Sequence, residues 1–241
     1  MSFRIVNPPD EEIAWCIQLY QSYPRQCLHY LRQSYPRSRV VLLVDGDAEN
    51  VERYQALGRE FQTQVIFGEH LMEFQTNHLY VARLMHQAVA GPETYFFRID
   101  PDTRIWRRFS WLPGMSCAFG TLETVTVAFK DRIRHPPNIQ GGCIGLTRDV
   151  SQSILTQDIL SYDSCVKEAR KGWVRTLDCE HLATSGKMLD DFVISWAVDT
   201  AGFPLIQHAE IASYWRDAIN NKKLQFVVTH PHKEMDMADD S

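Results

Sequence analysis

The chain has 241 residues, of which 44% are hydrophobic and 23% are charged, and its formal net charge is -5 at pH 7. This length can bury one sizeable core, and the acidic balance argues against a nucleic-acid-binding surface, which needs an excess of Lys and Arg. No run approaches the roughly 18 consecutive apolar residues of a membrane-spanning helix, and the start of the chain lacks a signal-peptide pattern. We therefore expect one cytoplasmic domain over residues 1–234, followed by a flexible acidic tail at 235–241.

The first predicted elements precede residue 38. Apolar side chains between 13 and 20 follow the i, i+3, i+4, i+7 spacing of an amphipathic helix, which Asp10 could cap. The pentapeptide Gln-Ser-Tyr-Pro-Arg occurs at 21–25 and again at 33–37, and the proline in each copy predicts the end of a helix. The side chains on the apolar face of the first helix would be Ile13, Cys16, Ile17 and Tyr20.

From residue 39 the sequence alternates between strand and helix patterns. Two continuous apolar runs indicate strands that are buried on both faces of a sheet, a third run indicates a short strand, and segments with helical spacing separate them. This order predicts right-handed crossovers onto a parallel sheet, whose ligands bind beyond the carboxyl ends of the strands. The apolar runs lie at 39–44, 64–68 and 95–99, and the helices follow Asn50 and Asn77.

The second half of the chain has a more mixed pattern. An extended segment is predicted at 122–129, a glycine-containing strand at 139–146, and a helix at 149–160. No linker composition separates this half from the first. The fold class predicted from these patterns is α/β, with a mixed, mainly parallel central sheet flanked by helices.

Two carboxylates follow the strand at 95–99. Asp100 and Asp102 are two residues apart, so they project to the same side of an extended backbone, and Pro101 favours that backbone in the residue before it. This pair suits a hard divalent cation, Mn²⁺ or Mg²⁺, which leaves its other positions to water and phosphate oxygens. The alternative is an Asp-Pro-Asp turn that only caps the next segment. The position at the end of an apolar strand favours the metal site.

The segment 95–102, Tyr-Phe-Phe-Arg-Ile-Asp-Pro-Asp, resembles the strand and DxD motif of GT-A fold glycosyltransferases. The acidic strand end at 44–47 resembles the family's nucleoside-side strand, and the Ile-Gln-Gly-Gly segment at 139–142 resembles its acceptor-side strand. Together the matching segments extend over about residues 39–232. The resemblance implies a Rossmann-like GT-A domain that transfers a sugar from a nucleoside diphosphate donor, with UDP as the leaving group, to an unknown acceptor hydroxyl.

The resemblance also implies how the domain is divided and which residues it uses. The nucleotide-binding half would be about 1–105, and the acceptor-side half about 106–234. By resemblance, donor contacts are assigned to Asp45, Gly46 and Asp100, and the acceptor side to Gly141 and Gly142. From side-chain chemistry, Arg98 and Lys233 could contact the diphosphate and Trp173 could lie on the acceptor side, although Arg98 could instead be solvated or paired with carboxylates. Trp173 would offer an apolar face to a sugar ring, although tryptophan is commonly a core residue.

Two histidines end an apolar run at 226–229. His230 and His232 resemble the C-terminal histidine that completes the metal shell in many GT-A enzymes, and imidazole suits Mn²⁺ better than Mg²⁺. We favour His230 over His232 as the ligand. The alternative for either one is an ordinary surface histidine.

An acidic pair begins the predicted helix at 189–197. By resemblance, Asp190 and Asp191 correspond to the place where an inverting enzyme keeps its general base, which removes the proton of the acceptor hydroxyl. We favour Asp191 over Asp190. A structural role is the alternative, because aspartate at a helix N-terminus caps the helix and interacts well with its dipole.

Two other functions stay open at the level of sequence. A nucleotidyltransferase also combines a cation with diphosphate chemistry, but the chain has no GxxxxGK[ST] phosphate loop. A GT-A-like protein could also keep its nucleotide and cation sites without efficient transfer, since a fold does not establish turnover.

Overall fold

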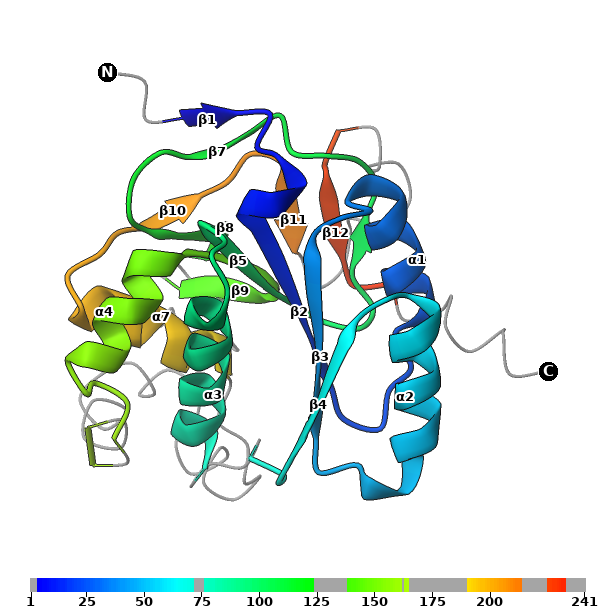
Figure 1. Ribbon diagram of the computed structural model, residues 1–241. Helices are drawn as coiled ribbons and strands as arrows, with labels where there is room; N and C mark the ends of the chain where they lie inside the picture. Colours follow the sequence, from blue (N-terminus) through cyan, green and yellow to red (C-terminus); the bar gives the residue numbers. More distant parts are fainter. Residues whose placement is uncertain are drawn as a thin grey trace, which may run out of the picture.

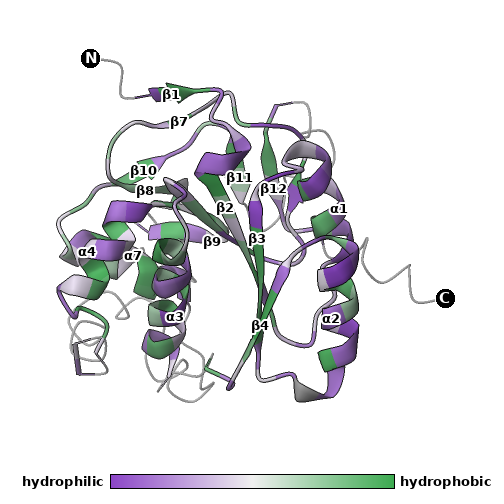
Figure 2. Cartoon of the chain, viewed as in Figure 1, coloured by the Kyte–Doolittle hydropathy of each residue, from purple (hydrophilic) through white to green (hydrophobic). Residues whose placement is uncertain are grey.

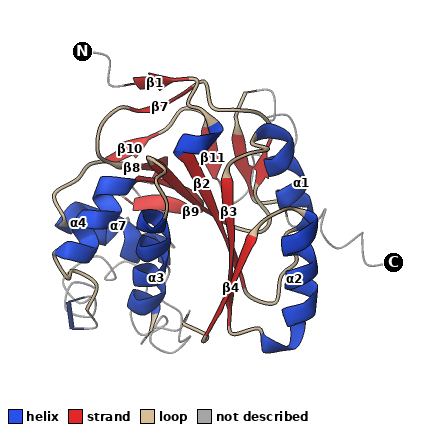
Figure 3. Cartoon of the chain, in the orientation of Figure 1, coloured by secondary structure: helices blue, strands red, loops and turns tan. Residues whose placement is uncertain are grey.

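The computed structural model describes residues 4–71, 76–123, 138–161, 163–164, 190–213 and 225–232. In these residues a seven-stranded central sheet lies between two layers of helices (Figure 1, Figure 3). Its strands are β2 (Ile13–Leu19), β3 (Arg39–Asp45), β4 (Gln64–Gly68), β5 (Tyr95–Ile99), β8 (Ala118–Glu123), β9 (Asn138–Thr147) and β10 (Leu205–Gln207). The helices are α1 (Arg25–Ser34), α2 (Val51–Glu60), α3 (Asn77–Ala90), α4 (Arg148–Thr156) and α7 (Asp190–Thr200).

The sheet is mixed but mostly parallel, as predicted. The strand order is β10-β8-β9-β5-β2-β3-β4, with β2 paired in parallel to both β3 and β5. Strand β9 runs antiparallel to both of its neighbours, β5 and β8. The carboxyl ends of β2, β3 and β5 therefore meet at one edge of the sheet, and the beginning of β9 lies at that same edge.

Each face of the sheet has its own hydrophobic core. Helices α1 and α2 pack on the face that carries Trp15 and Phe97, whereas α3, α4 and α7 pack on the face that carries Cys16 and Phe96. Figure 2 shows the central strands as mainly hydrophobic and the outer surfaces of the helices as mainly hydrophilic. Burial on both faces is the reason that these strands lack a polar side.

Strand β2 corrects the prediction for the N-terminal segment. The predicted helix at 13–20 is wrong, because Ile13–Leu19 is a fully buried strand at the centre of the sheet. A strand buried on both faces is apolar at nearly every position, so it also satisfies helical spacing. The proline prediction is half right: Pro24 precedes the first residue of α1 instead of ending a helix, whereas α1 does end before the second Tyr-Pro pair.

The other predicted elements in the described residues are confirmed. Strands appear as β3, β4, β5 and β9, and helices as α2, α3, α4 and α7. The extended segment predicted at 122–129 is described only as far as the end of β8, and its remainder lies outside the described residues. No helix in the described part of the chain has both the length and the hydropathy to cross a membrane.

Two smaller sheets complete the described fold. One pairs β1 (Arg4–Val6) with β7 (Trp111–Pro113), and the other has the order β11-β12-β6. The second sheet consists of β6 (Arg104–Ile105), β11 (Ile211–Ser213) and β12 (Val228–His230), and its apolar side chains join the core beneath α1. This sheet carries His230 to the carboxyl end of β5.

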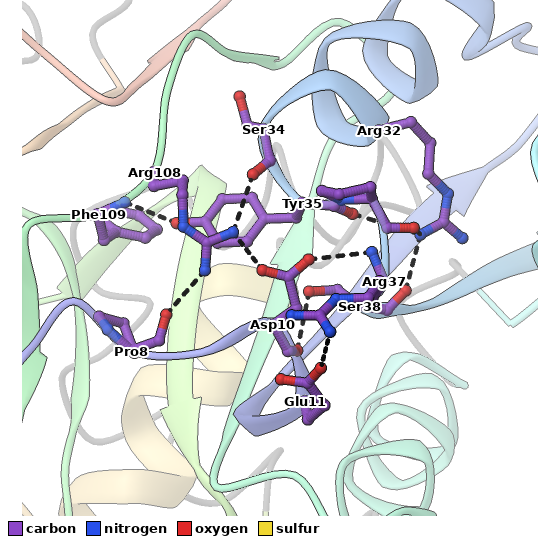
Figure 4. Close-up of polar contacts among 11 residues, drawn as sticks. Pro8, Asp10, Glu11, Arg32, Ser34, Tyr35, Arg37, Ser38, Arg108 and Phe109 are labelled. Carbon is purple, nitrogen blue, oxygen red and sulfur yellow. Dashed lines mark hydrogen bonds and ion pairs between the residues drawn. The ribbon is translucent and has the colours of Figure 1, made fainter.

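The opposite edge of the central sheet is held by a polar network around Asp10 (Figure 4). Asp10, in the short helix η1 (Asp10–Glu12), is buried, and its carboxylate accepts hydrogen bonds from the Arg108 side chain and from the backbone N–H of Arg37. The Ser38 hydroxyl donates to the Asp10 carbonyl at 3.0 Å. The network ties the starts of β2 and β3 to the segment before β7. It therefore lies away from the carboxyl ends of the strands.

Candidate metal site and acidic pair

The Asp100–Asp102 segment is fixed against the beginning of β9. The backbone N–H of Asp100 donates to the Gly142 carbonyl at 3.3 Å, and the Thr103 hydroxyl donates to the same carbonyl at 2.7 Å. A turn closes the segment, since the Thr103 N–H donates to the Asp100 carbonyl at 3.1 Å. The register of β9, in which Cys143 pairs with Ile99, places Gly142 beside the end of β5.

Three side chains converge at this edge in a group that could hold a metal ion. Asp100, Asp102 and His230 each offer one ligand atom, and these atoms lie within 4.8 Å of one another. The His230 Nε2 atom is 3.2 Å from Asp100 Oδ2 and 3.1 Å from Asp102 Oδ1. Two carboxylate oxygens with one imidazole nitrogen suit Mn²⁺, and the carboxylates alone also suit Mg²⁺.

The charged groups of this site stabilise one another's ionised forms. Burial by itself would lower the pKa of His230, but hydrogen bonds to Asp100 and Asp102 outweigh it and raise the pKa to about 9. Burial would raise the pKa of Asp100, yet the Arg98 charge and His230 bring it below its ordinary value. On the other side of the imidazole, Nδ1 lies 3.2 Å from the Ser213 hydroxyl, a contact that orients the ring.

His232 has a different environment. Its Nε2 atom is 2.7 Å from the Thr229 hydroxyl, which also accepts a hydrogen bond from the Trp106 indole at 2.8 Å. Burial and then the charge of Arg104 lower the pKa of His232 to about 4. Its backbone N–H donates to the Asp102 carbonyl at 3.1 Å. His232 thus holds the acidic segment through its backbone, while His230 faces the carboxylates.

Arg98 lies inside the site. Its Nη1 is 2.7 Å from Asp100 Oδ1, and its Nη2 is 2.7 Å from Asp190 Oδ2. Nη2 also donates to Gln18 Oε1 at 2.6 Å, and Nη1 donates to the Gly141 carbonyl. The guanidinium predicted to contact the donor is therefore engaged with protein groups.

The two aspartates at the start of α7 have different environments. Asp190 is buried and paired with Arg98, whereas Asp191 is partly exposed. Burial, followed by the charge of Asp190, raises the pKa of Asp191. The Asp191 side chain lies next to Gly141, where an added Cβ would come within 3.4 Å of Asp191 Oδ2. Both glycines of the predicted acceptor side thus lie at the site, Gly142 against His230 and Gly141 against Asp191.

The residues predicted near the nucleoside lie two strands away from β5. Asp45, at the end of β3, is fully buried, and its carboxylate accepts the Leu71 N–H at 2.9 Å and faces His70 Nδ1 at 2.8 Å. Gly46 has a φ of 73°, and a side chain there would overlap His70. These contacts fix the segment that follows β4.

Sequence reasoning did not identify the aromatic side chain at this end of the sheet. Tyr20 follows β2, is 47% exposed, and stacks on the His70 ring with 4.6 Å between the ring centroids. Such a flat apolar surface can bind another ring by stacking. Its position directly after a buried strand could have indicated a place in the site, but the prediction of a helix at 13–20 hid that position. Lys233 and Trp173, the remaining predicted site residues, lie outside the described residues.

Comparisons with known proteins identify no family for the chain: no protein-family model matches it, and no curated protein sequence matches it. The function is therefore argued from the α/β fold and from the chemistry of this site.

Proposed function

We propose that this chain is a metal-dependent glycosyltransferase that moves a sugar from a nucleoside diphosphate donor, with UDP as the leaving group, to an acceptor hydroxyl. The observation that carries the proposal is the convergence of Asp100, Asp102 and His230 at the carboxyl end of β5. A second acidic pair lies beside this group, joined to it through Arg98. The resemblance of residues 95–102 to a DxD motif points to the same chemistry.

Each part of the site has a role in such a transfer. Asp100, Asp102 and His230 would hold Mn²⁺ or Mg²⁺, and the cation would stabilise the negative charge of the diphosphate that leaves. The bond between the sugar and the diphosphate breaks, and a new bond forms between the sugar and the acceptor oxygen. For transfer with inversion, Asp191 takes the proton of the acceptor hydroxyl.

Asp191 suits the role of base better than Asp190. The Asp190 carboxylate is paired with Arg98, and its side chain is only 8% exposed. Asp191 is more accessible, and its raised pKa makes its carboxylate a stronger proton acceptor than an ordinary aspartate. Its Oδ1 also accepts a hydrogen bond from the Phe192 N–H at 2.9 Å, which restrains the side chain.

The donor site can be tested by calorimetric titration of UDP into wild type and Asp102→Ala, each with Mn²⁺ and with chelator. We expect wild type to bind UDP only with Mn²⁺, and the variant to lose at least about tenfold in affinity because a cation ligand is gone. Asp199→Ala, which removes an exposed carboxylate in the last turn of α7, is the matched control and should bind as wild type does. UDP binding that is absent or independent of metal would overturn the UDP assignment.

The products released on turnover distinguish the three candidate functions: glycosyltransferase, nucleotidyltransferase and binding protein. Wild type incubated with UDP-sugars and Mn²⁺ should release UDP, while a nucleotidyltransferase would instead release pyrophosphate from a nucleoside triphosphate and a sugar phosphate. Release of neither product, with UDP still bound, would indicate a binding protein.

Asp191→Asn should lower kcat by about 100-fold or more, because a general base contributes roughly that factor. It should leave the UDP affinity within about twofold of wild type, since Asp191 is not in the group that could hold the metal. Wild-type kcat in this variant would remove Asp191 from the mechanism.

A further inference from the structure

The Arg98 guanidinium is a buried charge that joins two acidic groups from distant parts of the chain. Arg98 is 3% exposed and lies in β5 on the sheet face that α7 covers. Asp100 lies against its Nη1 and Asp190 against its Nη2, each at 2.7 Å. A single cation thus balances one carboxylate of the metal-binding group and one carboxylate at the start of α7.

The position of this guanidinium is fixed by other contacts. Gln18 from β2 accepts from Nη2 at 2.6 Å, and the Gly141 carbonyl from β9 accepts from Nη1. Guanidinium is planar and its donors have a fixed geometry, so four partners leave it little freedom to turn. A shift of any partner therefore changes the contacts of the others.

Asp100 divides its two oxygens between Arg98 and the metal-binding group. Oδ1 contacts Arg98, while Oδ2 faces His230 on the side where the cation would bind. A cation that draws on the charge of Asp100 weakens the attraction between Asp100 and Arg98. Arg98 is then held more strongly by Asp190, which lies next to Asp191 in the chain.

We propose that Arg98 is a positioning residue that couples cation binding at Asp100, Asp102 and His230 to the first turn of α7. This inference rests on the proposed function, since it assumes that the three residues bind a cation. Coupling between two sites is reciprocal, so the cation fixes the start of α7, and the pairing of Asp190 with Arg98 strengthens cation binding. The consequence is that Asp191 is held in place for reaction when the cation is bound.

The test is calorimetric titration of Mn²⁺ alone into wild type, Asp190→Asn and Asp191→Asn. In Asp190→Asn the charge of Arg98 is no longer balanced by Asp190, so Arg98 attracts Asp100 more strongly and leaves less of its negative charge for the cation. We therefore expect the Mn²⁺ affinity to fall by about fivefold or more. Asp191→Asn makes the same substitution in the same helix turn but leaves the ion pair between Asp190 and Arg98 intact. It should change the affinity by less than about twofold.

A second readout follows amide hydrogen exchange in the first turn of α7. At saturating Mn²⁺, exchange there should slow more than in the rest of α7 in wild type, and this local difference should be smaller in Asp190→Asn. A change in overall stability would alter both parts of the helix alike.

The outcomes separate this inference from the proposed function. Mn²⁺ binding by wild type with equal affinities in the two variants, or with no change of exchange in α7, overturns the coupling and leaves the metal site standing. Absence of Mn²⁺ binding to wild type overturns both.

Discussion

At Gly142 the backbone of β9 passes so close to the candidate metal site that no side chain fits. An added Cβ would overlap both the His230 ring and the Ser213 hydroxyl. We expect Gly142→Ala to displace the imidazole and to weaken Mn²⁺ binding by about tenfold or more, as loss of an orienting contact commonly does.

The neighbouring glycine provides the control for this prediction. At Gly141 an added Cβ would have its nearest contact at 3.4 Å, from Asp191 Oδ2, which is close to ordinary van der Waals distance. Calorimetric titration of Mn²⁺ should therefore give Gly141→Ala an affinity within about threefold of wild type. Equal losses of Mn²⁺ affinity in the two variants would mean that the close approach of Gly142 does not determine the position of His230.

Single residues also show what sequence could predict of the site. Asp100 and Asp102 were predicted as possible cation ligands from their place at the end of an apolar strand, and His230 was favoured through the resemblance to GT-A enzymes. The burial of Arg98 between carboxylates did not follow, since Asp190 is far from it in sequence. Likewise, two histidines separated by one proline have the same local pattern, and only the neighbouring strands determine which ring faces the site.

Among the elements, η1 depends on one buried carboxylate. Asp10 joins η1 to the segment before β3 through Arg37 and to the segment before β7 through Arg108 (Figure 4). We expect Asp10→Ala to lower the free energy of unfolding by about 1.5–3 kcal/mol, because the Arg37 N–H and the Arg108 side chain lose a buried, charged acceptor. Urea denaturation followed by circular dichroism measures the change.

The adjacent Glu11 is a matched control for Asp10. It pairs with Arg37 at 3.1 Å, but both side chains are largely exposed. Exposed ion pairs contribute little, so Glu11→Ala should cost less than about 1 kcal/mol. Equal stability of the two alanine variants would mean that the buried Asp10 carboxylate does not stabilise η1.

The elements differ in how well their sequences identify them. Strand β5 was predictable because it is apolar, short and followed at once by Asp-Pro-Asp. Strand β2 was not, because Trp15, Cys16 and their neighbours are buried on both faces and fit either periodicity. What decides between the two is the pairing of β2 with β3 and β5, which is tertiary information.

At the scale of the whole molecule, His208 makes stability depend on pH. It is fully buried, stacks on Trp111 with 4.2 Å between the ring centroids, and its Nδ1 accepts a hydrogen bond from the Glu210 N–H. Burial is the largest cause that lowers its pKa to about 4. The unfolded chain, with a histidine pKa of about 6.5, therefore binds the proton more readily than the folded chain.

The stability contributed by neutral His208 is fully present above about pH 6.5 and is lost as the pH falls towards 4. Over that range we expect a loss of about 3 kcal/mol from this residue. His232 has a similarly lowered pKa, so His208→Gln should reduce the slope of unfolding free energy against pH only in part. An unchanged slope in chemical denaturation would show that His208 is not the group that titrates.

The four groups around the Arg98 guanidinium come from β2, from the residue after β5, from β9 and from α7, which are spread over most of the described chain. Contacts between residues so far apart in sequence require the closure of long loops, which costs entropy before the contacts gain any energy. A growing chain contains Asp100 and Asp102 before it contains Gly142 and His230, which contact them. The proposed cation site is therefore complete only once these long-range contacts between the described elements have formed.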